Sequence, residues 1–404
     1  MPILDPINLY DFESISKSIL PHNVWDYISS GCQDGIALKR NRLMLDSILL
    51  RPRFLRDVGK RNLSTTILGE PIKSPVMIAP ASRQTLAHPD GEIATARAAA
   101  TAGTIMALST SSAKSIEEVA QAAPGPLWFQ LFHCGKEETE SLIRRAEDSG
   151  YKAICLTVDT PIPSDKEADI RNNWRTPPEA YPGNFMHKTT PPTPGNLDSG
   201  ISEGHHHRPP TVPLTFEQLP WLKSLTRLPI VIKGIRTAED AELCVKYDID
   251  GIIVSIHGGR QIDCTLSSIE SLPEIVTAVN GKAEIYFDSG VRRGSDVLKA
   301  LAIGAKGVFI GRPIFWGLAV NGQAGVEKVL DILYRELDLV LAYCGFTTVD
   351  QIDDAILHLP LEMDYSRIPY IEEIRGLADL HAKGLISRQE FDSKKDSLLG
   401  TENQ

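Results

Sequence analysis

Eight short apolar runs recur along the chain, and each is followed by a segment with helical character. The runs are almost continuously apolar instead of alternating, which is typical of parallel strands buried on both faces. Strands that alternate with helices favour a parallel sheet covered by helices, and eight such units favour a closed barrel. The runs occupy residues 75–80, 104–110, 127–132, 153–159, 229–233, 251–257, 284–290 and 307–313.

The segments between the runs carry helix start and stop signals. Residues 92–103 are Ala-rich and end in Gly, and residues 237–247 begin at a Thr cap with Asp240 three residues on. Residues 295–304 begin at Ser and stop at Gly. The Gly-rich turn G-x-G-x-x-G of dinucleotide-binding open sheets is absent from the sequence. We therefore predict an α/β fold of the (β/α)8 TIM-barrel type rather than an open doubly wound sheet.

Composition limits the partners and the location. The net charge of −10 argues against a nucleic-acid-binding surface. The first residues lack the pattern of a signal peptide, and no apolar run approaches ~18 residues, so we predict no membrane association. The six cysteines are scattered without a C-x-x-C pair, as in reduced cytoplasmic proteins. The C-terminus is not the peroxisomal S-K-L signal; cytoplasm is the predicted location, with the peroxisome as the alternative.

One segment interrupts the alternation of strands and helices. Residues 175–213, after the fourth run, are rich in Pro, Gly and His, and we predict a long, mobile loop there. Long loops at such a place serve as lids or functional insertions. The triplet His205–His207 offers metal ligands, but a solvated polar loop is the simpler interpretation. No metal site is therefore predicted.

The end of the chain reads as a helical hairpin separate from the barrel. Gly384 ends a first helix, and Ser387 with Glu390 forms a capping box for a second. An apolar seam comprises Ile374, Leu377, Leu385, Ile386, Phe391 and Leu398. The pattern resembles the SHOCT short C-terminal domain, which implies a packing or oligomerisation appendage. We predict a barrel domain over residues 1–365 and a SHOCT-like tail over residues 366–404.

Polar side chains stand at the C-terminal end of every predicted strand. In a parallel barrel these ends face the active site. A single Lys or His at a strand end has an ordinary structural explanation, but polar groups at all of the ends together indicate a site. They are Ser82, Ser109, Gln130, Thr157, Lys233, His257 with Arg260, Asp288 and Arg312.

Two clusters within this set indicate a chemistry. Residues 288–296 and 311–313 follow the last two runs, where barrels bind phosphate through helix N-termini and an arginine. Arg260 suits a carboxylate because its guanidinium can donate two parallel hydrogen bonds. His257, three residues away, is suited to accept a proton near neutral pH. The residues alone thus predict a phosphate-bearing cofactor and an anionic small-molecule substrate with an abstractable proton.

Longer motifs connect the chain to a known family. They are RPRFLRDV (51–58), LAHPDGEIATARAA (86–99), FQL (129–131), LTVDTP (156–161), KGIRTAEDA (233–241), DGIIVSIHGGRQID (250–263) and GVRRGSDVLKALAIGAKGVFIGRP (290–313). In these motifs, over roughly residues 7–350, the chain resembles the FMN-dependent α-hydroxy acid oxidases and dehydrogenases. The resemblance implies an FMN-binding barrel with an N-terminal helical segment. It also implies a homo-oligomer, with a tetramer expected, and O2 as a candidate electron acceptor.

The resemblance also implies residue roles. His257 is expected to be the active-site base, with Asp159 stabilising its imidazolium while hydride equivalents pass to flavin N5. Tyr27 and Arg260 are expected to hold the substrate carboxylate, and Lys233 to stabilise the reduced flavin. The expected cofactor-binding residues are Ala81, Ser82, Ser109, Gln130, Thr157, Lys233, Ser255, Asp288, Gly290, Arg292, Gly311 and Arg312.

The chain departs from the family pattern mainly on the substrate side. Phe132 replaces a tyrosine, Lys166 replaces a carboxylate-binding arginine, and Ser111 replaces a tryptophan. Both Phe132 and Lys166 are still expected to border the substrate. Ile256 replaces an asparagine and Ser289 a glycine, while the flavin turn reads A-P-A-S instead of A-P-T-A. A lost aromatic wall and a lost guanidinium fork predict a larger pocket with a weaker grip on a small acid.

The leading hypothesis is an FMN-dependent oxidoreductase that converts a 2-hydroxy acid, larger than glycolate or lactate, to the 2-oxo acid. One alternative keeps FMN but performs a different oxidation or a desaturation on a larger metabolite. Another is a catalytically impaired flavin barrel that serves as an assembly module. Retention of Tyr27, Asp159, His257 and Arg260 argues against the last alternative.

Overall fold

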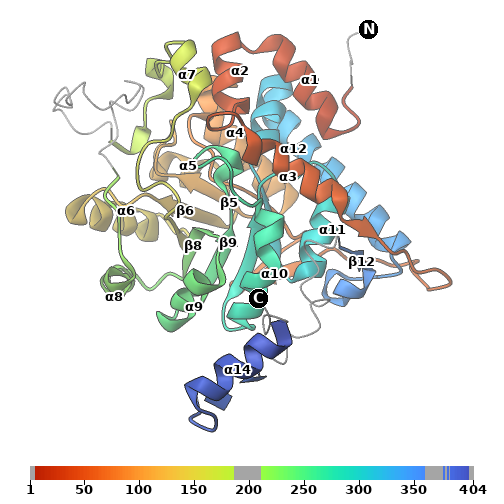
Figure 1. The fold of residues 1–404 in the computed structure, drawn as a ribbon. Helices are drawn as coiled ribbons and strands as arrows, with labels where there is room; N and C mark the ends of the chain where they lie inside the picture. The colour runs from red at the N-terminus through yellow and green to blue at the C-terminus, as the bar shows by residue number, and fades with distance from the viewer. Residues whose placement is uncertain (1–4, 186–210, 360–375, 378–379, 382, 400–404) are drawn as a thin grey trace. The chain divides into compact units, whose positions relative to one another are not determined.

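A closed barrel of eight parallel strands forms the centre of the molecule, which confirms the predicted fold (Figure 1). The structure is a computed structural model that describes residues 5–185, 211–359, 376–377, 380–381 and 383–399. Around the barrel the strands follow the order β10, β11, β4, β5, β6, β7, β8, β9. They are β4 (Val76–Ile78), β5 (Met106–Ser109), β6 (Leu127–Leu131), β7 (Ala153–Thr157), β8 (Ile230–Ile235), β9 (Gly251–Val254), β10 (Glu284–Asp288) and β11 (Gly307–Ile310), and each overlaps its predicted run.

Large apolar side chains fill the barrel interior. Trp128 packs against Tyr286 and Phe309, with ring centroids 5.5 Å and 5.7 Å away. Smaller inward side chains from the other strands, such as Cys155 and Val231, complete this cluster. The opposite faces of the strands are also buried, which accounts for the continuous apolar runs. Because the interior is packed, a site can open only at the end of the barrel.

Helices surround the barrel. They are α4 (Gly91–Ala102), α5 (Ile116–Ala122), α6 (Lys136–Asp148), α7 (Glu167–Arg171), α8 (Leu219–Ser224), α9 (Ala238–Lys246), α10 (Ser268–Val279), α11 (Gly294–Ile303) and α12 (Arg312–Tyr343). The predicted caps of two helices are confirmed. The Thr237 side chain accepts a hydrogen bond from the Asp240 backbone N–H at 3.3 Å, and Gly103 ends α4 with a φ of +68°.

Helix α11 starts one residue before the predicted Ser295. The backbone N–H of Gly294 donates to Glu336 Oε2 at 2.9 Å, and that of Arg293 donates to Asp296 Oδ2 at 3.0 Å. A side chain at position 294 would collide with α12, since its Cβ would lie 2.2 Å from the Leu337 backbone nitrogen. Carboxylates from this helix and from α12 therefore do the capping that the sequence assigned to Ser295.

Three helices precede the barrel, as the family resemblance implied: α1 (Leu9–Ile19), α2 (His22–Ser29) and α3 (Ile36–Ser47). They are tied to the turn after β9. The Cys32 backbone N–H donates to the Gly259 carbonyl at 2.8 Å, and that of Ala37 donates to Asp263 Oδ1 at 2.7 Å. The N-terminal segment thereby reaches the mouth of the barrel.

The start of the predicted loop after β7 packs against the rest of the protein. Its first residues form two short 3-10 turns, and Ala180 and Phe185 in them are buried. Residues 186–210, including His205–His207, lie outside the described residues. The remaining short elements are β1 (Leu49–Leu50), β2 (Thr65–Ile67), β3 (Glu70–Ile72), β12 (Leu357–His358), η1 (Gln84–Leu86), η2 (Pro178–Ala180), η3 (Gly183–Phe185), η6 (Phe216–Gln218), η7 (His257–Gly259), η8 (Val349–Gln351) and η9 (Asp354–Ile356).

The chain divides into two compact units: Met1–Asp46 with Leu50–Leu357, and Ser47–Leu49 with His358–Gln404. In the second unit, helix α14 (Arg388–Leu399) begins at the predicted capping box. Ser387 N–H donates to Glu390 Oε2 at 2.8 Å, and Glu390 N–H donates to Ser387 Oγ at 3.2 Å. Ile374 lies outside the described residues, so the domain boundary and the full seam stay predictions. In the described part of the chain, no helix has the length and hydropathy to span a membrane.

Candidate functional site

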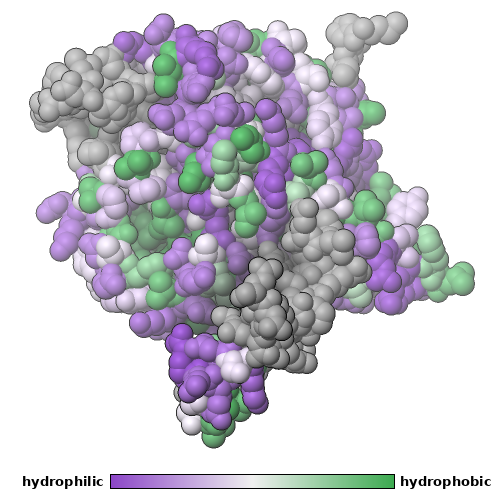
Figure 2. Space-filling view, viewed as in Figure 1, coloured by the Kyte–Doolittle hydropathy of each residue, from purple (hydrophilic) through white to green (hydrophobic). Residues whose placement is uncertain are grey.

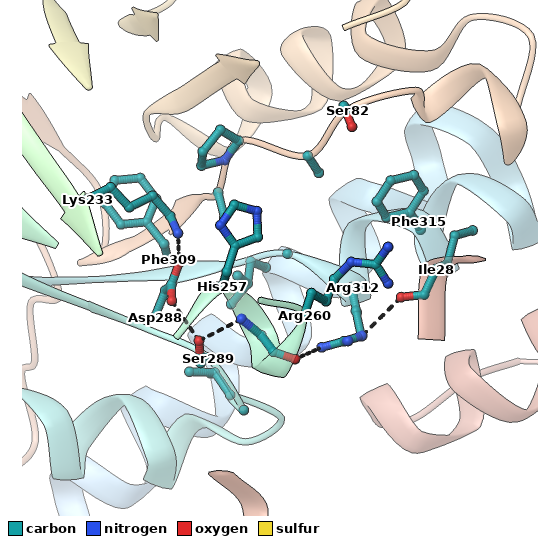
Figure 3. Close-up of a pocket in the computed structure, with 18 of the residues that line it drawn as sticks. Ile28, Ser82, Lys233, His257, Arg260, Asp288, Ser289, Phe309, Arg312 and Phe315 are labelled. Atoms are coloured by element: carbon teal, nitrogen blue, oxygen red, sulfur yellow. Dashed lines mark hydrogen bonds and ion pairs between the residues drawn. The ribbon is translucent and has the colours of Figure 1, made fainter. Parts of the chain in front are cut away.

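A pocket opens at the C-terminal ends of the strands, where the sequence predicted the site (Figure 3). Its apolar lining includes Phe309 of the barrel interior, Phe315 of α12 and Ile28 of α2. The predicted residues that line it are Tyr27, Ala81, Ser82, Lys233, His257, Arg260, Asp288, Gly290, Arg292, Gly311 and Arg312. The predicted residues that do not line it are Asp159, Lys166, Phe132, Ser109, Gln130, Thr157 and Ser255.

His257 and Asp159 form a pair across two strand ends. His257 Nδ1 lies 2.9 Å from Asp159 Oδ1, and the imidazole is about a quarter exposed while the carboxylate is buried. Burial raises the pKa of Asp159, but the charge and hydrogen bond of His257 outweigh it and hold that pKa below its usual range. A carboxylate that stays ionised fixes the orientation of the imidazole.

The two glycines after His257 form a turn in which a side chain would collide with neighbouring residues. Gly258 has a φ of +66°, and a Cβ there would lie 2.7 Å from Arg312 Nη1. Gly259 has a φ of +75°, and its Cβ would lie 2.7 Å from the Leu38 backbone nitrogen in α3. His257 itself adopts a φ of +53°, in the left-handed region. The turn η7 therefore reverses the chain after β9, between His257 and Arg260.

Lys233 lies at the centre of a buried polar cluster. Its Nζ lies 3.1 Å from Asp288 Oδ2 and donates to Ser255 Oγ at 2.7 Å (Figure 3). Burial lowers the pKa of Lys233, but Asp288 and Asp159 more than compensate, so the ammonium stays charged. Ser289 Oγ donates to Asp288 Oδ1 at 2.7 Å and adopts a φ of +88°, where the family pattern has glycine.

Arg312 is partly buried and has no carboxylate partner among the described residues. Its guanidinium donates to the backbone carbonyls of Ile28, Ser30 and Gly258 at 2.9–3.0 Å. Burial, and then the charge of Arg260, lower the pKa of Arg312 to about 9. A guanidinium in that environment favours an anion in the adjoining pocket.

Arg292 adds a second such cation. Its Nη1 donates to the Val291 carbonyl at 2.8 Å, and its guanidinium lies 4.6 Å from the Trp316 ring centroid. Burial lowers the pKa of Arg292. Because α12 begins at Arg312 with Gly311 as its N-cap residue, two guanidinium groups and a helix N-terminus meet on this side. The arrangement suits a phosphate.

Two polar atoms deeper in the site lack partners. Gln130 Nε2 and Thr157 Oγ1 are buried without a hydrogen bond in the described structure. The other end of the Gln130 amide accepts from Ser109 Oγ at 3.1 Å, which fixes its orientation. Buried polar atoms of this kind need a partner, and a ligand with hydrogen-bonding edges supplies one. Both residues were predicted from the sequence to contact the cofactor.

Tyr27 organises the substrate side. Its ring stacks on Trp174 at 4.6 Å between centroids, and Arg260 Nη1 donates to its carbonyl at 2.6 Å. Burial raises the pKa of Tyr27, but the charges of Arg83 and Arg260 outweigh it and hold that pKa below its usual range. The hydroxyl is thereby a stronger hydrogen-bond donor toward an anion.

Lys166 precedes α7 and stands near Arg260 and Asp169. Burial, and then the charge of Arg260, lower the pKa of Lys166 to about 8. Burial raises the pKa of Asp169, whose Oδ1 has no hydrogen-bond partner in the described structure. Phe132 follows β6, and its backbone N–H donates to Thr110 Oγ1 at 3.0 Å. Its predicted contact with a substrate stays a prediction.

Arg83 is the site residue that sequence reasoning missed. It follows Ser82 at the end of β4, and its Nη1 donates to Tyr27 Oη at 2.8 Å. The φ of Arg83 is +61°, in the left-handed region, and no local sequence pattern predicts that conformation. The sequence feature that could have indicated Arg83 is a charged residue directly after the turn that follows β4.

Among the described residues, no group of three or more His, Cys, Asp or Glu side chains is placed to hold a metal ion. Lys233, Arg260, Arg292 and Arg312 bring positive charge to the pocket lining. These groups suit carboxylate and phosphate ligands.

Known proteins share this architecture. The family described as FMN-dependent dehydrogenase matches residues 16–359, a span that contains all eight barrel strands and every candidate site residue. The L-lactate oxidase of Nostoc sp. is 47% identical over 365 residues, which cover 88% of this chain and 99% of that protein. Glycolate oxidase 1 of Oryza sativa subsp. indica is 46% identical over 367 residues, covering 90% and 98%. A crystal structure of mandelate oxidase matches with a TM-score of 0.80 at 36% identity, covering 88% of this chain and 98% of that one.

Proposed function

We propose that this chain, which belongs to the FMN-dependent dehydrogenase family, oxidises a 2-hydroxy acid to the corresponding 2-oxo acid. The observation that carries the proposal is the His257–Asp159 pair, 2.9 Å apart, one turn from Arg260 at the same strand end. A base and a carboxylate clamp on one rigid turn suit a substrate whose hydroxyl and carboxylate are on adjacent carbons. Similar proteins are named for oxidising lactate and glycolate, which have this arrangement.

FMN fits the polar groups of the site. Arg292, which is buried, and Arg312, which is partly buried, have no carboxylate partners in the described structure and would hold its phosphate. Gln130 Nε2 and Thr157 Oγ1, which lack partners there, would bond the polar edge of its ring system. Lys233 keeps a positive charge beside that region. When bound, FMN supplies the two-electron acceptor of the reaction.

His257 would act as the base. With Nδ1 donating to Asp159, Nε2 is left to accept the proton of the substrate hydroxyl. As that proton moves, the hydrogen on the same carbon leaves with two electrons, and the alcohol becomes a ketone. The ionised Asp159 carboxylate stabilises the imidazolium that forms.

We propose further that the substrate is larger than glycolate or lactate. Ser111, in place of the family's tryptophan, is a small buried residue whose N–H donates to Ser109 Oγ at 3.1 Å. Phe132 lacks the hydroxyl of the family's tyrosine, and Lys166 lacks the guanidinium fork. These changes remove bulk and polar contacts from the substrate side without touching His257.

Anaerobic reduction of the flavin tests the function. The holoenzyme is mixed with 2-hydroxy acids of increasing chain length, and bleaching of the flavin absorbance is followed. Fast, saturable bleaching by a longer 2-hydroxy acid, with slow bleaching by glycolate and lactate, is the expected result. The His257→Gln variant, which keeps a similar volume, serves as the control for proton abstraction.

The remodelled substrate side also supports a second candidate, a different oxidation or desaturation of a larger metabolite. The specific observation is that Ser111, Phe132 and Lys166 depart from the family pattern together. Failure of every 2-hydroxy acid to bleach a fully FMN-loaded protein would favour this candidate. A protein that purifies colourless and takes up no FMN would instead favour an assembly module.

We propose O2 as the electron acceptor and a homotetramer as the assembly. Similar proteins are named oxidases, which supports O2, and an oxygen electrode measures it. Leu43, Phe54 and Leu55 expose large apolar side chains along and after α3, and Figure 2 shows hydrophobic residues on that part of the surface. Light scattering should give four times the 44.4 kDa chain mass, and the mass of one chain would refute the assembly. Cytoplasmic location stays a prediction that fractionation can test.

A further inference from the structure

Arg83 is a buried cation for which the proposed reaction has no use. Its residue is only 7% exposed, and its φ of +61° is one that the surrounding fold must maintain. One nitrogen, Nη1, donates to Tyr27 Oη at 2.8 Å, while Nε is buried without a partner in the described structure. A buried guanidinium with an unsatisfied N–H is costly unless a ligand completes its hydrogen bonds.

Arg83 and Arg260 approach Tyr27 from opposite ends. Arg260 donates to the backbone carbonyl of Tyr27 at 2.6 Å, and Arg83 donates to its phenolic oxygen at 2.8 Å. Their guanidinium carbons lie 5.2 Å and 5.8 Å from the ring centroid. The two cations are thus separated along the length of one tyrosine and form two anchor points instead of a single carboxylate clamp.

The charge balance around Tyr27 favours an anionic ligand. Arg83, Arg260 and Lys166 are each near enough to act on both Tyr27 and the buried Asp169, and Asp26 also acts on Asp169. Three cations thus face two carboxylates, and burial raises the pKa of one of them, Asp169. Positive charge therefore remains in excess at this end of the site.

We propose that the substrate is a 2-hydroxy acid with a second carboxylate, bound by Arg83 and Lys166 while Arg260 and Tyr27 hold the carboxylate next to the reacting carbon. The inference rests on the proposed function, since it assigns the substrate class of the same site. The reaction is unchanged: the hydroxyl proton passes to His257, and the hydride equivalent leaves the same carbon. The second carboxylate takes no part in bond breaking and contributes binding alone.

A matched substrate pair tests the inference. 2-Hydroxyglutarate and 2-hydroxypentanoate have the same chain length and differ by a carboxylate in place of a methyl group. We expect kcat/KM for the diacid to exceed that for the monoacid by about 100-fold, because the unpaired cations penalise a methyl group. Equal values, or a preference for the monoacid, would overturn the inference while leaving the proposed function intact.

Binding is measured separately from turnover. 2-Oxoglutarate and 2-oxopentanoate, which cannot be oxidised in this reaction, are titrated into the holoenzyme, and the shift of the flavin spectrum gives each Kd. Tighter binding of the diacid by about 100-fold supports the second subsite even if the oxidation proves to be of another kind. Equal Kd values contradict the subsite whatever the substrates do.

Variants assign the subsite to Arg83. Arg83→Gln should reduce the diacid-to-monoacid ratio to near one, and Arg83→Lys, which keeps the charge, should retain part of it. Arg97→Gln, an exposed arginine on α4, is the control and should leave the ratio unchanged. FMN content and melting temperature report whether each variant folds. If Arg83→Gln loses FMN, Arg83→Lys decides: a ratio that falls below the wild-type value but stays above one, with a wild-type KM for the monoacid, supports the subsite, and an unchanged ratio or a ratio of one refutes it.

Discussion

The two halves of the barrel mouth contrast in how far they keep the family pattern. The ends of β8–β11 supply Lys233, His257, Asp288 and Arg312, all as the pattern requires. The ends of β4–β7 carry most of the departures, at Ser82, Ser111, Phe132 and Lys166. The first half is also held by a continuous network from Lys233 through Asp288 and Ser289 to the turn η7 (Figure 3). The first half thus keeps the residues expected to bind the cofactor and move the proton, and the second half carries the substitutions on which the proposed change of substrate rests.

The largest effect on turnover is expected from a substitution of His257, in the half of the barrel mouth that keeps the family pattern. His257→Gln removes the base and should lower kcat by about 10²–10⁴-fold, because general-base catalysis contributes about that much. Stopped-flow anaerobic reduction measures it, with bound FMN per chain as the control. A variant that bleaches as fast as the wild type would show that the retained half does not do the chemistry.

Lys233→Met tests the buried network of the same half. It leaves Asp288 buried without a cation, and removing one partner of such a pair costs about 3–5 kcal/mol of unfolding free energy. Urea unfolding of the holoenzyme measures the loss. The double variant Lys233→Met with Asp288→Asn should recover part of it, since no uncompensated charge remains. An unchanged midpoint would mean that this half is not organised by the ion pair.

Restoring the family's residues on the substrate side should increase activity toward a small 2-hydroxy acid. Lys166→Arg with Phe132→Tyr restores a guanidinium fork and a hydroxyl. A hydrogen bond to a charged group is worth about 1.5–3 kcal/mol, so kcat/KM for glycolate should rise about 10–100-fold. Leu131→Ile, a buried strand change of equal volume, controls for general perturbation. No gain would place glycolate discrimination outside these two positions.

The smallest effect is a pH dependence from Lys166. Its pKa of about 8, lowered by burial and by Arg260, means that the ammonium is charged below that pH and neutral above it. Tyr27, Asp169 and Cys32 also act on it and oppose the shift. The kcat/KM for an anionic substrate should fall as pH rises through about 8. Lys166→Arg should remove that fall, because arginine keeps its charge; a fall that persists in this variant must come from another group.

Much of the barrel could be predicted because a strand that is buried on both faces appears in the sequence as a continuous apolar run. Runs such as 127–132 are apolar throughout, and a polar residue such as Gln130 within one therefore indicates a site. His257 and Arg260 were found in the same way, at the end of an apolar run. Arg83 was not, because its position depends on a left-handed turn and on Tyr27, which is remote in sequence. The prediction of where α11 starts was wrong for a similar reason, because Glu336, which is remote in sequence, caps the helix from α12.

The turn His257–Gly258–Gly259–Arg260 has a consequence for how such a protein can diversify. The glycines fit so closely against Arg312 and α3 that His257 and Arg260 are fixed to each other by backbone. Residues 83, 111, 132 and 166 lie on separate loops after other strands. A substitution at any one of these four positions therefore leaves the turn that carries His257 and Arg260 in place.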